Sequence, residues 1–239
     1  MTPGIITDSW TVVLKEWREW RCVRARFGWG ALLLLTVAWG SAAPLLLGSF
    51  AAGSLLVPLA WAALPSTLAG AMITDAIAGE RERQTLETLL ASRLSDRAIL
   101  LGKVVAITLL GWLLLVLGAL PGILHQMLTT GMSSVSPAVM ARTVLGVVAP
   151  TVLMIVLAGA LISLYTPTMR FALLLTIAFA GFLILGAAVL VAGWIHQSGA
   201  IPDDTTPFVI AAASVTVVDG VLLGWLLSAA HRDRLLAIG

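Results

Sequence analysis

The chain has 239 residues, of which 59% are hydrophobic and only 11% are charged, and its mean hydropathy is +1.03. So few polar side chains cannot cover a water-soluble globule, which leaves lipid as the solvent. The net charge of +2 is too small to indicate nucleic-acid binding, and the single cysteine, Cys22, excludes an internal disulfide.

Residues 1–28 form a polar N-terminal segment with one amphipathic helix. Apolar side chains recur at helical spacing, namely Trp10, Val13, Leu14, Trp17 and Trp20. Charged side chains lie mainly on the other side of the same helix, namely Lys15, Glu16, Arg18, Glu19 and Arg21. This pattern predicts an interfacial helix, with tryptophans at headgroup depth and basic groups towards anionic lipid.

Residues 29–229 form the predicted transmembrane domain. The hydrocarbon core is about 30 Å thick and needs about 20 helical residues to cross it. Six apolar segments reach that length, at 29–50, 53–76, 99–124, 141–164, 171–195 and 208–229. Pro44, Pro58 and Pro65 interrupt the first two, so these could cross fully or form a re-entrant hairpin. The sequence therefore predicts an all-α polytopic membrane protein of about six spans with a tail at 230–239.

The basic residues predict the orientation in the membrane. In a six-span topology thirteen of the fourteen Lys and Arg residues fall on one side, and only Arg142 falls on the other. Cytoplasmic loops are enriched in basic residues. We therefore expect both termini in the cytoplasm and the protein in the cell (inner) membrane.

The longest predicted cytoplasmic connection is residues 79–98, which contain GERERQTLETLLASRLSDR. Residues 79–92 favour a helix with Leu86, Leu89 and Leu90 on one stripe, and Ser95 with Asp96 predicts a cap for the next span. An apolar stripe in water calls for a partner groove. The alternative is that residues 79–98 serve only to connect two spans. Asp75 lies just before this connection and is expected to reach water and pair with arginines of the loop.

The stretch 73–103, ITDAIAGERERQTLETLLASRLSDRAILLGK, resembles the signature of ABC-2 type transporter permeases, and VLKEWREWRCVRAR resembles their N-terminal elbow helix. Two departures are Gln84 and Arg93, where the family often has Gly and Pro. The resemblance implies a cytoplasmic gate at Glu80 and Glu82 and an ATPase-coupling helix after it. The implied coupling residues are Glu80, Glu82, Thr85, Leu86, Glu87, Leu89 and Leu90.

The resemblance also implies the partners. These are two copies of an ABC ATPase subunit, a second permease subunit as homodimer or heterodimer, and the lipid membrane, with no nucleic acid. ATP and Mg²⁺ are expected on the ATPase. The pair Gly102–Lys103 is no phosphate-binding loop of this chain, because Arg97 stands where such a loop has its first glycine and Val104 where it has Ser or Thr.

Asp219 lies in the middle of the last predicted span, where an ionised carboxylate costs at least about 2.5 kcal/mol unless it is paired or wetted. Beside it runs a ladder of small residues, namely Ala212, Thr216, Gly220, Gly224 and Ser228. Such a ladder lets another helix approach closely. A polar contact in a transport route and a buried packing hydrogen bond are equally open readings of Asp219.

Two other classes of protein compete with a permease that exports or flips a small or lipophilic substrate. A membrane-embedded enzyme needs a nucleophile with a base, or clustered acids, and no such motif occurs in the sequence. A membrane assembly factor or channel without an ATPase fits the hydrophobicity but leaves the loop helix unexplained. We expect no catalytic residue in this chain and no metal site, since His125 and His196 are isolated.

Overall fold

The computed structural model describes residues 5–24, 29–47, 56–84, 95–130, 144–198 and 206–229, and in these ranges every regular element is a helix. The elements are α1 (Ile5–Arg24), α2 (Trp29–Leu47), α3 (Leu56–Thr74), the π-helical turn η2 (Asp75–Gly79), α4 (Glu80–Glu82), α6 (Asp96–Thr130), the π-helical turn η3 (Val144–Val148), α8 (Ala149–Tyr165), α9 (Met169–Ser198) and α10 (Thr206–Ala229). The predicted all-α fold is confirmed.

Four helices in the described part are long and apolar enough to cross a membrane: Asp96–Leu124, Val144–Tyr165, Met169–Leu190 and Val209–Ala229. Helices α2 and α3 have 19 residues each, which corresponds to about 28 Å. Each runs unbroken through its internal proline, Pro44 or Pro65. Helices α2, α3, α6, α8, α9 and α10 coincide with the six predicted apolar segments, and among the described residues the apolar part of α2, Gly30–Ala43, is shorter than a full span.

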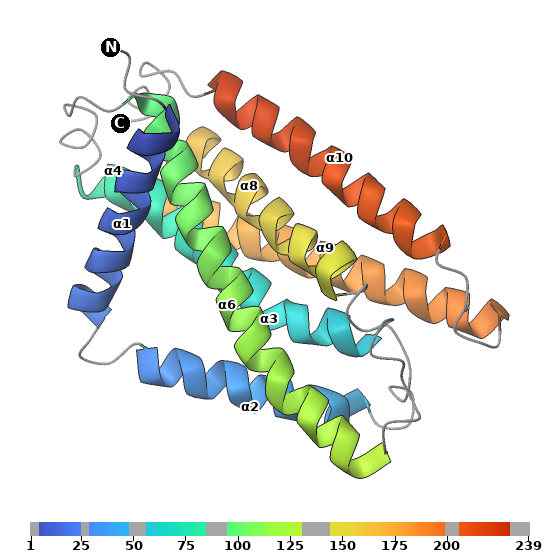
Figure 1. The fold of residues 1–239 in the computed structure, drawn as a ribbon. Coiled ribbons are helices and arrows are strands. Elements are labelled where there is room, and N and C mark those ends of the chain that lie inside the picture. The colour runs from blue at the N-terminus through green and yellow to red at the C-terminus, as the bar shows by residue number, and fades with distance from the viewer. Residues whose placement is uncertain are drawn as a thin grey trace.

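The helices run in alternating directions between two ends of a bundle (Figure 1). One end gathers α4, the beginning of α6 and the ends of α8 and α10, and α9 begins there through a contact between Glu82 and Met169. We call it the α4 end. Helix α1 lies across the bundle beside α6 rather than along it (Figure 1). This is the arrangement expected of an interfacial helix beside a set of spans.

The centre of the bundle is an apolar core shared by α3, α6 and α8. Its fully buried side chains include Ile73, Ile107, Val152 and Val156. By contrast, α9 and α10 leave about half of their described apolar side chains exposed, such as Phe182 and Val217. In a membrane protein these exposed apolar faces meet lipid or another membrane helix.

Glycines set the close approach of α2 to α6. A Cβ on Gly122 would lie 2.6 Å from the carbonyl oxygen of Gly40 and 2.6 Å from Nε1 of Trp61, and a Cβ on Gly40 would overlap the Gly118 backbone. The Trp61 indole N–H donates to the Gly40 carbonyl at 3.1 Å. Gly118 and Gly122 are four residues apart on one face of α6, the spacing that lets membrane helices pack backbone to backbone.

Candidate functional site

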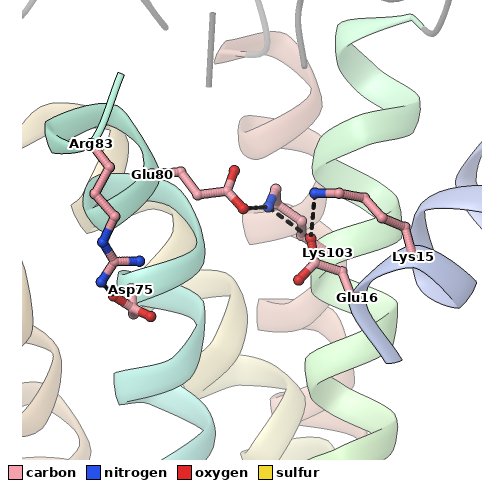
Figure 2. Close-up of polar contacts among 6 residues, drawn as sticks. All are labelled: Lys15, Glu16, Asp75, Glu80, Arg83 and Lys103. Atoms are coloured by element: carbon pink, nitrogen blue, oxygen red, sulfur yellow. Dashed lines mark hydrogen bonds and ion pairs between the residues drawn. The ribbon is translucent and has the colours of Figure 1, made fainter. Parts of the chain in front are cut away.

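Charged side chains from four elements converge at the α4 end. We call this group the polar cluster; its members are Glu16, Asp75, Glu80, Arg81, Glu82, Arg83 and Lys103. They come from α1, η2, α4 with the turn after it, and α6. Figure 2 shows Lys103 lying between Glu80 and Glu16, with Arg83 turned towards Asp75 on the other side of α4.

Lys103 is the centre of the polar cluster. Its side chain is 0% exposed, and Nζ donates to Oε1 of Glu80 at 2.7 Å and to Oε1 of Glu16 at 2.9 Å. Lys15 lies 3.8 Å from the same Glu16 oxygen and adds a second positive charge. A buried charge that loses its only partners destabilises a protein by about 3–5 kcal/mol. The two carboxylates therefore hold Lys103 in place and tie α1 and α4 to α6.

A close contact between helices places Glu16 beside Lys103. A Cβ on Gly102 would lie 2.5 Å from Cβ of Val12 and 2.8 Å from the Ser9 carbonyl, so the glycine allows α1 to rest directly on α6. Glu16 follows Val12 by four residues and therefore shares its helical face.

This placement corrects one expectation. The sequence pattern put Glu16 on the charged side of α1, opposite the apolar side that holds Val13. Instead Val12, Val13 and Glu16 are all buried, whereas Trp10 and Trp17 remain exposed. Helix α1 therefore has a protein-facing side as well as an outer apolar side, because it packs on α6.

Arg81 and Glu82 hold the connection between α8 and α9 from both ends. The Arg81 guanidinium donates to the carbonyls of Ser163, at 3.2 Å, and of Thr166, where α8 ends. Glu82 Oε1 accepts the backbone N–H of Met169 at 2.6 Å, where α9 begins. A cation at a helix C-terminus and a carboxylate at a helix N-terminus both satisfy otherwise unpaired backbone groups and match the helix dipole. Burial lowers the pKa of Arg81, and the Glu82 charge acts in the opposite direction.

The chain turns sharply just after α4. Arg83 pairs with Asp75 at 2.9 Å, as predicted for Asp75. Gln84 then has a φ of 56°, in the left-handed region that favours glycine. The expectation of one helix over residues 79–92 is therefore wrong at Arg83 and Gln84, because a left-handed residue ends a right-handed helix. Gln84 stands where the ABC-2 pattern often has Gly. This chain therefore departs from the family pattern at the residue whose left-handed backbone favours glycine.

Two of the predicted coupling residues, Glu80 and Glu82, lie within the polar cluster. The other five, Thr85, Leu86, Glu87, Leu89 and Leu90, lie outside the described residues. The predicted cap of the following span is confirmed, since the Ala98 N–H donates to Oγ of Ser95 at 3.3 Å.

The structure separates Asp219 from the small-residue ladder. Asp219 is buried, whereas Thr216, Gly220 and Gly224 are exposed, and a Cβ on either glycine would meet nothing within 4 Å. The Thr216 hydroxyl donates to the Ala212 carbonyl of its own helix. Within the described part of the chain, therefore, no helix packs on the ladder at these two glycines.

Of the seven members of the polar cluster only Glu80 and Glu82 were predicted as site residues; Asp75 was expected to pair with loop arginines, and Glu16, Arg81 and Lys103 were not anticipated at all. One signal was present: Lys103 is a lysine inside an otherwise apolar helix, and such a residue calls for a nearby carboxylate. The partner on α1 could not be identified without knowing that α1 packs on α6.

A model of the family described as ABC-2 family transporter protein matches residues 44–209, more than half of the chain. No curated protein matches the chain. With its apolar spanning helices, the chain is a multi-pass membrane protein and belongs to the ABC-2 transporter family, as a permease rather than a catalytic subunit.

Proposed function

We propose that this chain is the permease of an ABC exporter and that a separate ATPase subunit drives it through α4 and the segment that follows it. The observation that carries this proposal is the polar cluster. Three consecutive residues of α4 contact three different parts of the bundle: Glu80 contacts Lys103 of α6, Arg81 contacts the end of α8, and Glu82 contacts the start of α9.

This geometry suits a mechanical relay. A partner can move a set of packed helices only through an element that is firmly attached to them. Helix α4 is too short to be held by apolar packing alone, and charge-assisted hydrogen bonds supply the attachment. Lys103 extends it to α1 through Glu16. Force applied to the segment after Gln84 would thus reach α1, α6, α8 and α9 together.

The proposal includes an orientation and an assembly. The α4 end faces the cytoplasm, where thirteen of the fourteen basic residues are expected. The ATPase subunit binds ATP and Mg²⁺ on the same side. Two permease subunits and two ATPase subunits form the complex, as the family resemblance implies. The connections at the other end are short, so the complex exports or flips a small or lipophilic substrate without an external receptor domain.

The experiment is affinity purification of the tagged chain from its own membranes, with an unrelated multi-pass protein as control. We expect an ATP-hydrolysing protein of a different size to co-purify with the chain and not with the control. Recovery of the chain without any associated ATP hydrolysis would contradict the proposed function.

Thiol labelling tests the orientation separately. Cys22 should resist a membrane-impermeant maleimide added outside intact cells, and a cysteine at position 203, made by Asp203→Cys in a Cys22→Ser background, should react. Labelling in the opposite sense would invert the proposed topology.

A further inference from the structure

Asp219 is a buried carboxylate that the polar cluster does not use. It lies inside the spanning segment Val209–Ala229, and its side chain is 6% exposed. Its Oδ1 atom is closed to solvent and has no hydrogen-bond partner among the described residues. A carboxylate in this environment is costly, and such residues are retained in membrane proteins where they meet a polar or charged partner.

The helix packed against Asp219 supplies no such partner. Asp219 shares a face of α10 with Leu222 and Leu226, which belong to the core built on α8. Neither η3 nor α8 contains a charged residue. The hydroxyls of Thr151 and Ser163 on α8 donate to carbonyls of their own helix. The Asp219 carboxyl group therefore lies in the contact between α8 and α10, which we call the seam, and the α8 side of this contact is apolar.

The seam is also the main contact between α10 and the rest of the described bundle. Among the described elements α10 packs mainly on α8 and η3, and its other faces are exposed. Towards the α4 end the same two helices bring Tyr165 and Trp225 together, with ring centroids 6.1 Å apart. Both rings are half exposed, and Trp225 lies six residues along α10 from Asp219, so the aromatic pair stands at the surface of this contact, about 9 Å along the helix from the carboxyl group. Aromatic faces attract organic cations, as a carboxylate does.

We propose that Asp219 is a recognition site for the positive charge of the transported substrate, which is a lipophilic organic cation that enters the seam between α8 and α10 from the bilayer. The inference rests on the proposed transport function and adds the substrate class. A cation of this kind partitions into lipid with its apolar body, and Asp219 is a buried acidic group that the protein leaves without a partner on the facing helix.

The test uses two probes of the same size and opposite charge, tetraphenylphosphonium and tetraphenylborate. Their binding is measured by equilibrium dialysis on the full chain in lipid nanodiscs, with empty nanodiscs subtracted. We expect the parent to bind the phosphonium saturably, and Asp219→Asn, which keeps the shape but not the charge, to bind it at least about tenfold more weakly. Binding of the borate should not differ between the two proteins. Asp96→Asn, an acidic residue at the start of α6, should leave both values unchanged.

Equal phosphonium affinity in the parent and in Asp219→Asn would overturn the proposal and make Asp219 a packing residue. An equal loss of phosphonium and borate binding would also overturn it, since the site would then select for shape and not for charge. If Asp219→Asn does not insert, Asp219→Glu replaces it and should retain phosphonium binding; loss of binding in a folded Asp219→Glu protein counts against the proposal. The assay contains no ATPase, so its result is independent of whether an ATPase docks after α4.

Discussion

The buried ammonium group of Lys103 lies 2.7 Å from the Glu80 carboxylate, and this ion pair joins the first part of α6 to the first residue of α4. Glu16 accepts a hydrogen bond from the same nitrogen and so attaches α1 to α6 as well. These two contacts form only while α1, α4 and α6 stay in position, so Lys103 fixes the interfacial helix to the bundle.

The first prediction concerns the ion pairs of Lys103 with Glu80 and Glu16. Lys103→Met fills similar space but leaves two carboxylates facing each other without a shared cation, and it should destabilise the protein by about 3–5 kcal/mol. The measurement is the thermal transition of the detergent-solubilised protein, followed by tryptophan fluorescence. Adding Glu16→Gln and Glu80→Gln to Lys103→Met should recover most of the loss. A single variant that melts with the parent would show that the ion pairs contribute nothing to the fold.

The second prediction separates the contacts of two neighbouring residues, Glu82 at the end of α4 and Arg83 in the turn after it. Glu82→Ala removes the acceptor of the Met169 N–H, so the first amides of α9 should exchange with solvent roughly tenfold faster. Arg83→Ala is the matched control, because the Arg83 side chain is 60% exposed and exposed ion pairs contribute about 0–1 kcal/mol. Hydrogen exchange read by mass spectrometry checks both. The same exchange rate at the start of α9 in the two variants would argue against the Glu82 cap.

The third prediction concerns the turn after α4. Gln84 holds a left-handed backbone that costs a residue with a Cβ about 1–2 kcal/mol. We expect Gln84→Gly to raise the thermal transition and Gln84→Val to lower it, because a β-branched residue fits this conformation worst. A Gln84→Gly protein less stable than the parent would mean that the Gln84 side chain contributes more than the strain costs.

The fourth prediction contrasts two glycines in long membrane helices. Gly122→Val places carbon atoms against Gly40 and Trp61 and should destabilise the packing of α2 on α6 by about 1–3 kcal/mol. Gly220→Val meets no neighbour of the described chain and should leave the stability of the isolated subunit unchanged. Thermal transitions of the two variants in the same detergent give the comparison. Equal destabilisation by both would show that α10 is packed more closely than these contacts indicate.

Much of the fold follows from local sequence, because lipid imposes a simple rule on each segment. A run of about 20 apolar residues must form a helix to satisfy its own backbone, so the six predicted spans match α2, α3, α6, α8, α9 and α10 within a few residues, apart from a longer end of α6. The Ser95 cap was equally local, since it depends on one side chain and the amide three residues later.

The site was harder to predict because it depends on contacts between distant segments. Glu16 was expected on the charged side of an amphipathic helix, and the missing side chain of Gly102, which lets α1 lie on α6, helps to explain its burial. The turn at Gln84 was hidden by residues of good helix propensity on both sides, and propensity is a weak guide where the tertiary structure demands a left-handed backbone. Arg81 and Glu82 could be recognised as caps only once α8 and α9 were seen to meet at α4.

The most direct measurement is a pull-down of the purified cognate ATPase by the permease at matched expression, with the parent, Leu89→Asp and Thr88→Ser side by side. If the leucine stripe after α4 enters an apolar groove, the carboxylate of Leu89→Asp would be buried without a partner and should release the ATPase. Thr88→Ser should retain it, and both variants should be expressed and solubilised like the parent. We expect no ATPase in the Leu89→Asp lane; equal recovery in all three lanes would contradict docking through this segment.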